Sequence, residues 1–510
     1  MHNGAEVRAR FDAAAAQQRR RTLIVNTVSK GAAAQANLGL YGYSYDYVLG
    51  AFLPLLERWA EVVQVRSPES QLDFAIRRAR QADRQPLSLS FRPLADAYFS
   101  SRASNVVFPF WEFPDIPATD DRDNPRNNWL RIANRASLIL TASRFTAGAL
   151  ARAGVRPPVR VVPVPIQADY FELPPWDAGR VTTLDCTAYV FNDHEPARLE
   201  AADPESRPGA DSLRFRLAAR LRGLARTAWL RGIKPLLPGR VTGALVAAKN
   251  AGLAAWRAGP MQLPPASARL DLSGVVYTTL LNPDDQRKNW QDILSAFLLS
   301  LGERRDATLV VKLVTRSNEA VRDVLAHYYG LGLPHRAKVA FVTGYLSDGQ
   351  MRELALGSTY YLNASRAEGA CLPLQDFLAA GRPGIAPAHT ALADYFDDGL
   401  GFVVASQSEP CGWPHDDSGR LRTSWHRIDW SSLRQCLEES YRVARERRDR
   451  YMAMASAARL RMAEWASSDV AWSRLSSALE LVAADAEETG MPLVRGPHPT
   501  AGTTSAREPR

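Results

Sequence analysis

The sequence predicts an α/β protein with two Rossmann-like halves. Strand-like apolar runs alternate with helical stretches between residues 22 and 175, and a second alternation of the same kind begins near Leu272. Such alternation is typical of a mostly parallel sheet covered by helices. A length of 510 residues also favours two or three domains over a single core.

The elements of the first half follow one another in strand–helix order. After the first strand, residues 43–59 carry a helical pattern. A later helix follows a buried strand and ends on Gly154, which suits the C-terminal cap of a helix. The predicted strands are TLIVNTV (22–28), EVVQV (61–65), NVVFPF (105–110), SLILTAS (137–143) and VRVVPVPI (159–166).

The second half repeats this order and ends in helices. Helical stretches separate its strands, and several of them end on glycine. Residues 430–482 are predicted to be helical throughout. The predicted strands are SGVVYTTLL (273–281), ATLVVKLVT (307–315), AKVAFVTG (337–344) and STYYLNA (358–364).

An unusual segment, residues 181–268, lies between the halves. Its first third is rich in Asp, Glu and Pro and is expected to be an exposed loop, whereas the rest is basic with Leu and Ala at helical spacing. The expected division is an N-terminal extension (1–21), a first Rossmann-like domain (22–180), an insert with basic amphipathic helices (181–268), a second Rossmann-like domain (269–465), a C-terminal helix (466–485) and a disordered tail (486–510).

The net charge of +9 belongs to one part of the chain. Residues 211–258 contain ten basic residues and a single acid, Asp211, so the remaining residues sum to zero. This distribution argues against a nucleic-acid-binding character of the whole protein. The four cysteines lie far apart, no signal peptide is evident, and no apolar run approaches the ~20 residues of a spanning helix. These features fit a cytoplasmic protein.

Candidate chemistry lies in SRAEGACLPLQDFLAAGRPGIAP, residues 365–387. A strand precedes this segment and a helix is expected to begin near Pro373, so Glu368 lies in a loop at the carboxyl end of a strand. The N-terminus of that helix favours anionic oxygens, and Asp376 lies one turn further on. Both carboxylates suit pairs of sugar hydroxyls. The alternative is an ordinary helix start with a capping acid.

This segment resembles the E-x7-E signature of retaining GT-B glycosyltransferases, especially glycosyltransferase family 4 and its polysaccharide-building members. The chain departs from the family pattern at Ala370 and Cys371, which replace Phe-Gly, and at Asp376, which replaces the second Glu. The resemblance implies that Glu368 and the backbone of the following residues hold the transferred sugar, and that Asp376 holds the ribose. The matching residues are Ser365, Glu368, Gly369, Leu372, Pro373, Ala379 or Ala380, Gly381, Pro383 and Ile385.

The same resemblance extends upstream. Arg287 and Lys288, at a loop-to-helix junction, are similar to the family's cations that stabilise the departing nucleoside diphosphate; the alternative is a solvated charge pair. Lys312 is either a further phosphate contact or a strand-end lysine. Tyr345 in TGYLSDGQM resembles the nucleobase loop, or is simply an aromatic residue on a loop. Residues 27–46, which include Gly31, resemble the family's N-terminal loop that approaches donor phosphate and acceptor.

One further match lies in the first half. FPFWEFPDIP (108–117) resembles a W-E-x-P segment, which implies that Glu112 lies in the cleft near the acceptor or the transferred sugar, unless Trp111 and Glu112 are structural. None of the scattered histidines has metal-ligand spacing; His389 is expected just after the motif helix and His426 in a loop. This agrees with the family, whose members need no essential metal.

The sequence therefore predicts a GT-B glycosyltransferase with two domains facing across a cleft. The implied reaction moves a hexose from a nucleotide diphosphate sugar to a hydroxyl of a glycan or lipid-linked glycan, with retention, in cell-surface polysaccharide synthesis. Residues 211–258 suit anionic lipid headgroups, which would place the enzyme at the inner face of the cytoplasmic membrane, or form a helical hairpin packed on the enzyme or between subunits. A non-catalytic nucleotide-sugar- or glycan-binding relative is the main alternative; a dinucleotide enzyme is disfavoured because no GxGxxG follows the first strand.

Overall fold

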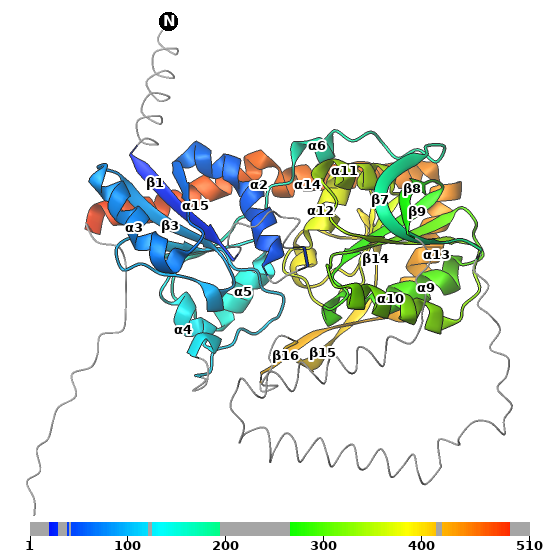
Figure 1. The fold of residues 1–510 in the computed structure, drawn as a ribbon, viewed down its shortest axis with the longest axis horizontal. Helices are drawn as coiled ribbons and strands as arrows, with labels where there is room; N and C mark the ends of the chain where they lie inside the picture. The colour runs from blue at the N-terminus through cyan, green and yellow to red at the C-terminus, as the bar shows by residue number, and fades with distance from the viewer. Residues whose placement is uncertain are drawn as a thin grey trace, which may run out of the picture. The chain divides into compact units, whose positions relative to one another are not determined.

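The computed structural model describes residues 20–28, 38–39, 42–120, 125–193, 266–414 and 421–489. Two Rossmann-like lobes lie within one compact unit of the chain. Each lobe is built on its own sheet, six strands in the first and eight in the second (Figure 1). Residues 211–258, with their predicted membrane helices, and Gly31 lie outside the described residues.

The first lobe has a fully parallel sheet in the order β2-β1-β3-β4-β5-β6. All seven residues of β1 are buried, as expected of a strand covered on both faces. The other strands are β2 (Glu61–Gln64), β3 (Gln85–Phe91), β4 (Ser104–Val107), β5 (Leu138–Thr141) and β6 (Val159–Val161), with β1 at Arg21–Thr27. The helices are α2 (Tyr43–Trp59), α3 (Pro68–Gln81), α4 (Trp129–Ala133), α5 (Arg144–Arg152) and α6 (Ala168–Phe171).

Helix α2 shows how the sequence pattern becomes packing. Val48, Phe52 and Leu56 lie four residues apart and are fully buried against the sheet. Gly42, just before the helix, has a left-handed backbone (φ 86°), and an added Cβ would lie 2.5 Å from the Val28 side chain. Glycine is therefore required where the chain turns into α2.

The second lobe has the strand order β14-β13-β12-β9-β10-β11-β7-β8. Strands β9 to β14 are parallel, whereas β7 and β8 are antiparallel additions at one edge. The strands are β7 (Thr182–Phe191), β8 (Ser267–Leu272), β9 (Val275–Leu281), β10 (Ala307–Leu313), β11 (Lys338–Thr343), β12 (Tyr360–Leu362), β13 (Gly384–Ala386) and β14 (Gly401–Val403). The helices are α9 (Trp290–Leu301), α10 (Asn318–Leu331), α11 (Asp348–Gly357), α12 (Leu372–Ala379), α13 (Trp430–Glu446) and α14 (Arg448–Ala466).

This topology corrects the predicted insert 181–268 at both of its ends. Strand β7 pairs with β11, and β8 pairs with β7, so both strands belong to the second sheet. The predicted boundary failed because β7 is covered on only one side and alternates in burial, a weaker signal than a continuous apolar run. A hairpin, β15 (Ser406–Gly412) with β16 (Arg422–Ile428), also forms where the sequence predicted a loop around His426.

The C-terminal helices return to the first lobe. The predicted continuous helix 430–482 is broken at Arg447 and Ser467, which separate α13, α14 and α15 (Ser468–Thr489). Leu475 and Leu479 of α15 pack in the same core cluster as α2. Glu480 accepts two hydrogen bonds from Arg21, at 2.5 and 2.9 Å, so α15 is fastened to the start of β1.

Candidate functional site

A cavity of about 640 Å³ is lined by both lobes. Its walls come from α2 and the segment after β4 in the first lobe, and from the carboxyl ends of strands in the second. Ligands bind at this edge of open α/β sheets. Every predicted site residue that the structure describes lines the cavity: Glu112, Arg287, Lys288, Lys312, Tyr345, Glu368, Gly369, Ala370, Cys371, Leu372 and Asp376.

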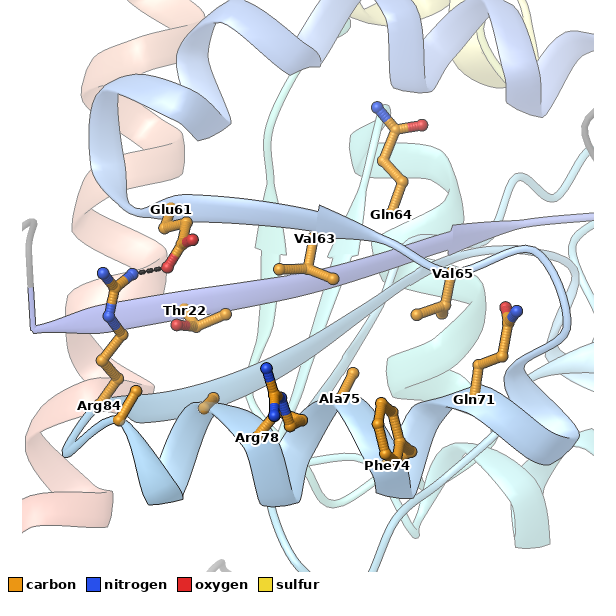
Figure 2. Close-up of a pocket in the computed structure, with 12 residues that line it drawn as sticks. Thr22, Glu61, Val63, Gln64, Val65, Gln71, Phe74, Ala75, Arg78 and Arg84 are labelled. Carbon is orange, nitrogen blue, oxygen red and sulfur yellow. Dashed lines mark ion pairs between the residues drawn. The ribbon is translucent and has the colours of Figure 1, made fainter.

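A second cavity, of about 450 Å³, lies between the edge strand β2 and α3 (Figure 2). Val63 and the exposed Phe74 line it, and an ion pair joins Glu61 to Arg84 at one end. None of the predicted site residues reaches this cavity. The cavity between the lobes is therefore the candidate site.

The loop between β12 and α12 positions Glu368. Asn363, at the end of β12, donates a hydrogen bond to Cys371 Sγ at 3.0 Å and lies 3.4 Å from Glu368 Oε1. Cys371 itself has a left-handed backbone (φ 55°) immediately before α12. The chain therefore turns sharply here, with Glu368 and the N-terminus of α12 both at the cavity. The helix begins at Leu372, one residue from the predicted start.

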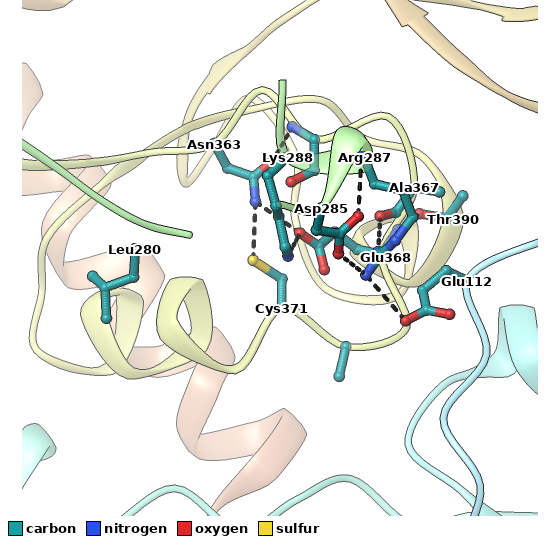
Figure 3. Close-up of polar contacts among 12 residues, drawn as sticks. Glu112, Leu280, Asp285, Arg287, Lys288, Asn363, Ala367, Glu368, Cys371 and Thr390 are labelled. Atoms are coloured by element: carbon teal, nitrogen blue, oxygen red, sulfur yellow. Dashed lines mark hydrogen bonds and ion pairs between the residues drawn. The ribbon is translucent and has the colours of Figure 1, made fainter. Parts of the chain in front are cut away.

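Two cations and three carboxylates meet beside this loop (Figure 3). Lys288 Nζ lies 2.6 Å from Glu368 Oε1. Arg287 donates to Asp285 at 2.7 Å and to the carbonyl of Ala367 at 2.7 Å. Its guanidinium also lies 3.3 Å from Glu112, which comes from the first lobe. Arg287 and Lys288 thus link Glu112 of the first lobe and Glu368 of the second in one charge network at the cavity.

The charges in this network are mutually stabilised. Burial alone would raise the pKa of Glu368, but the positive charges of Lys288 and Arg287 outweigh it and lower the pKa to about 2. Burial would likewise lower the pKa of Lys288, but Glu368 raises it above the ordinary value. Both groups are therefore charged at neutral pH.

Asp376 lies in a different environment. Burial raises the pKa of Asp376 to about 7, although the hydrogen bond from Tyr47 opposes this shift. The Tyr47 hydroxyl, from α2 of the first lobe, lies 3.4 Å from Asp376 Oδ2. The two acids of the motif therefore differ: Glu368 is held as an anion by cations, whereas Asp376 titrates near neutrality among tyrosines.

Lys312 and Tyr345 lie further along the cavity. Lys312 Nζ donates to the carbonyls of Gly344 at 2.6 Å and Leu313 at 2.9 Å, which leaves one of its three protons for a ligand. Burial lowers the pKa of Lys312 to about 8. Tyr345 lies near Tyr43 of α2: burial, followed by Tyr345, raises the pKa of Tyr43 to about 12.

Gly369 lies close to the backbone of the first lobe. A Cβ at this position would lie 3.3 Å from the carbonyl oxygen of Trp111 and 3.4 Å from its nitrogen. Trp111 is held in turn by Thr146, whose hydroxyl donates to the same carbonyl at 2.8 Å. This close backbone approach brings the neighbouring Glu112 to the cavity.

Sequence reasoning missed several residues of the cavity wall. Tyr43 and Tyr47 are spaced i, i+4, so they lie on one face of α2, and Asp348 begins α11. The i, i+4 spacing of two tyrosines in the first turns of α2 was the available signal. Tyr170 of α6 lies close enough to Asp376 for that carboxylate to raise its pKa, although burial is the larger cause.

Two catalogues of known proteins give no match: no family model and no curated protein matches the chain. Solved structures do match. Anabaena HepE in complex with UDP and glucose is 11% identical, covers 91% of this chain and 100% of its own, and has a TM-score of 0.49. Sucrose-phosphate synthase from Thermosynechococcus elongatus gives the same identity, coverages and TM-score.

A third similar structure is the pneumococcal O-GlcNAc transferase GtfA in complex with UDP and GlcNAc, which is 11% identical with a TM-score of 0.43 over 80% of this chain and 60% of its own. At these identities and TM-scores the three structures are similar to the chain and no more than that. The architecture itself decides the fold class, because two Rossmann-like lobes share one cavity and the last helix returns to the first lobe. The chain has the GT-B fold. The predicted α/β class with two Rossmann-like domains is therefore confirmed, whereas the predicted helical basic insert lies outside the described residues.

Two findings concern membranes and metals. Among the residues described, no helix has both the length and the apolarity to cross a bilayer. Within the same ranges, no group of three or more His, Cys, Asp or Glu side chains is arranged to hold a metal ion.

Proposed function

We propose that the protein is a retaining glycosyltransferase that moves a hexose from a nucleotide diphosphate sugar to a hydroxyl of a glycan or lipid-linked glycan. The observation that carries this proposal is the ion pair of Lys288 with the buried Glu368 near the N-terminus of α12, with Arg287 beside it. This arrangement offers cations for a diphosphate and an ionised acceptor for sugar hydroxyls within one cavity.

Arg287 and Lys288 act on the leaving group. The nucleoside diphosphate gains negative charge as its bond to the sugar breaks, so fixed cations lower the barrier. Arg287 is held by Asp285 and by the carbonyl of Ala367, so its guanidinium is fixed before the donor binds. These two cations and the N-terminus of α12 can supply the charge stabilisation, and we propose that the reaction needs no metal.

Glu368 and Asp376 bind the two sugars of the donor. Glu368 is charged at neutral pH and accepts hydrogen bonds from hydroxyls of the transferred hexose. Asp376, near α2 and its tyrosines, accepts the ribose hydroxyls. Tyr345 then lies in place to pack against the nucleobase, and the remaining proton of Lys312 is available to a phosphate oxygen.

Glu112 is the contribution of the first lobe. Its carboxylate is partly exposed at the cavity, 3.3 Å from Arg287, and opposite Glu368 across the network. An acceptor hydroxyl bound from the first lobe would meet the transferred sugar there. Retention would follow a front-face route, in which the nucleophile and the leaving group share one face of the sugar and no protein nucleophile is required.

Replacement of Glu368 tests the proposal directly. Glu368→Gln removes the charge at nearly constant volume, and we expect donor consumption to fall by roughly 10²–10³-fold. Glu353→Gln is the matched control, because Glu353 is exposed on α11 outside the cavity. Near-normal turnover of Glu368→Gln would rule out the proposed role. Turnover in excess EDTA checks metal independence.

The competing function is a non-catalytic relative that binds nucleotide-sugars or glycans. A panel of UDP- and GDP-sugars in a binding assay, followed by donor-consumption assays with the ligands that bind, separates the two functions. Binding without consumption by the wild type favours the non-catalytic relative. The same panel identifies the nucleotide and the sugar.

The membrane role rests on residues 211–258 alone. We propose that this basic segment binds anionic lipid headgroups and brings the enzyme to a lipid-linked acceptor in polysaccharide synthesis. Flotation with anionic liposomes compares the wild type with a deletion of 211–258. Equal recovery of the two proteins in the membrane fraction would contradict the proposal.

A further inference from the structure

The β15–β16 hairpin of the second lobe reaches the first lobe beside Glu112. Trp413, just after β15, lies with its ring centroid 5.5 Å from that of Trp111 and 5.7 Å from that of Trp129. Trp425 of β16 packs against the same cluster. Thr423 Oγ1 lies 3.4 Å from a carboxylate oxygen of Asp115 in the first lobe. The hairpin therefore contacts the segment that carries Glu112.

The same hairpin contacts the loop that carries Glu368. The ring of His426, on β16, stacks on the ring of His389 with centroids 4.0 Å apart and planes at 13°. The backbone N–H of His426 donates to the carbonyl of Arg366 at 2.8 Å. A flat stack of this kind fixes the plane of the buried His389 ring.

Thr390 connects the His389 ring to the backbone of Glu368 by hydrogen bonds. His389 Nδ1 lies 3.2 Å from Thr390 Oγ1, and Thr390 Oγ1 accepts the Glu368 N–H at 3.1 Å. The N–H of Ala391 donates to the Glu368 carbonyl at 3.2 Å. Both polar backbone groups of Glu368 are thus held by the segment that begins at His389.

Thr390 is held in an unfavourable conformation. Its φ of 50° is in the left-handed region, which a β-branched residue rarely adopts. Such strain persists where the surroundings over-determine the conformation, most often at functional sites. Here the His389 ring and the Glu368 amide both bind the Thr390 hydroxyl.

The imidazoles act here as neutral rings. Burial, followed by the neighbouring His426, lowers the pKa of His389 to about 3, against the opposing charge of Glu368. Burial also lowers the pKa of His426. Neutral His389 can accept the Thr390 hydroxyl proton at Nδ1 while Thr390 accepts from Glu368. The contribution of this pair is therefore geometric and not a fixed charge.

We propose that His426, His389 and Thr390 are positioning residues, through which the β15–β16 hairpin fixes the Glu368 backbone while it contacts the Glu112 segment of the opposite lobe. This inference rests on the proposed function, because Glu368 is taken to bind the transferred hexose. It assigns the hairpin a role in aligning the two acids that face the reacting sugar.

Paired variants separate positioning from simple loss of packing. Thr390→Val removes the hydroxyl but keeps the β-branched shape, whereas Thr390→Ser keeps the hydroxyl. His426→Ala removes the stack, whereas His426→Phe restores a flat ring. We expect kcat to fall roughly 10–100-fold in Thr390→Val and His426→Ala with little change in donor KM, because misplaced groups weaken contacts formed in the transition state. Thr390→Ser and His426→Phe should remain within about threefold of the wild type.

Hydrogen exchange provides a readout independent of turnover. The Glu368 amide should exchange faster in Thr390→Val and His426→Ala than in the wild type, and no faster in the control Gln407→Ala, an exposed change on β15. Unchanged exchange of the segment 364–372 in both variants would overturn the proposal, as would an equal loss of kcat in His426→Phe. If the wild type consumes no donor, the proposed function fails, and the exchange comparison alone decides the positioning role.

Discussion

The buried carboxyl of Asp376 predicts an unusual pH dependence of stability. Asp376 is only 7% exposed, and burial is the main reason that its pKa is raised to about 7; Asp348 adds to the shift and Tyr47 opposes it. Asp376→Asn removes the titration at nearly constant volume. The amide oxygen of asparagine can still accept the hydrogen bond from Tyr47.

The sign and size follow from linkage between protonation and folding. An unfolded aspartate has a pKa of about 3.9, so between about pH 4 and pH 7 the folded state binds the proton more tightly. The contribution of Asp376 to stability is fully present below about pH 4 and is lost as the pH rises through 7. The difference between the two pKa values corresponds to at most about 4 kcal/mol. The asparagine variant has no such loss.

Thermal unfolding at about pH 5 and about pH 8.5 measures this effect, and a domain of about 150–250 residues shifts by roughly 2–4 °C per kcal/mol. Relative to the wild type, Asp376→Asn should gain several degrees between the lower and the higher pH. Asp323→Asn is the control, because Asp323 is exposed on α10, outside the cavity, and does not contribute to the Asp376 shift. A constant difference between the wild type and Asp376→Asn across this range would refute the reasoning.

Three further changes probe the charge network and the lobe contact. Lys288→Met leaves Glu368 buried without its nearest cation, so the free energy of unfolding in urea titration should fall by about 3–5 kcal/mol. The double variant Lys288→Met/Glu368→Gln should regain most of that stability, because no unpaired charge is then buried, but it should not regain turnover. The stabilising effect of Glu368 is present above about pH 4.5 and is lost as the pH falls towards 2. The wild type and Glu368→Gln should therefore converge in stability during acid titration. Parallel curves of stability against pH would contradict the assigned ion pair. Gly369→Ala places a Cβ 3.3 Å from the Trp111 carbonyl oxygen, which should lower the free energy of unfolding by no more than about 1–3 kcal/mol. Turnover should fall severalfold. An unaffected kcat would show that the close approach of the two lobes is dispensable.

The sequence predicted much of the site because its motif is local. A strand, a loop and a helix start follow one another within about twenty residues, so Glu368 had to lie at the carboxyl edge of the second sheet. The helix α2 was likewise predicted with its observed bounds, because its apolar stripe repeats at helical spacing.

Other elements carried a weaker or misleading signal. Strand β3, QPLSLSF, lies between β1 and β4 in the first sheet, yet its two serines give it a polar appearance. The buried Ser90 hydroxyl donates a hydrogen bond to Asn26 Oδ1 on β1 at 2.8 Å, which makes its burial tolerable. That partner comes from another strand, so the sequence of β3 alone does not reveal that the serine is satisfied.

The sequence by itself determined the two Rossmann-like halves and the residues that would meet at the edge of the second sheet. Tertiary structure alone decided what those residues contact: Arg287 meets Glu112 of the other lobe, and Asp376 meets Tyr47, 329 positions earlier in the chain. It also divided the motif into one acid that is charged at neutral pH and one that titrates near neutrality. The physical reason is that local periodicity fixes where a side chain leaves its own strand or helix, whereas burial and charge depend on the segments that pack against it.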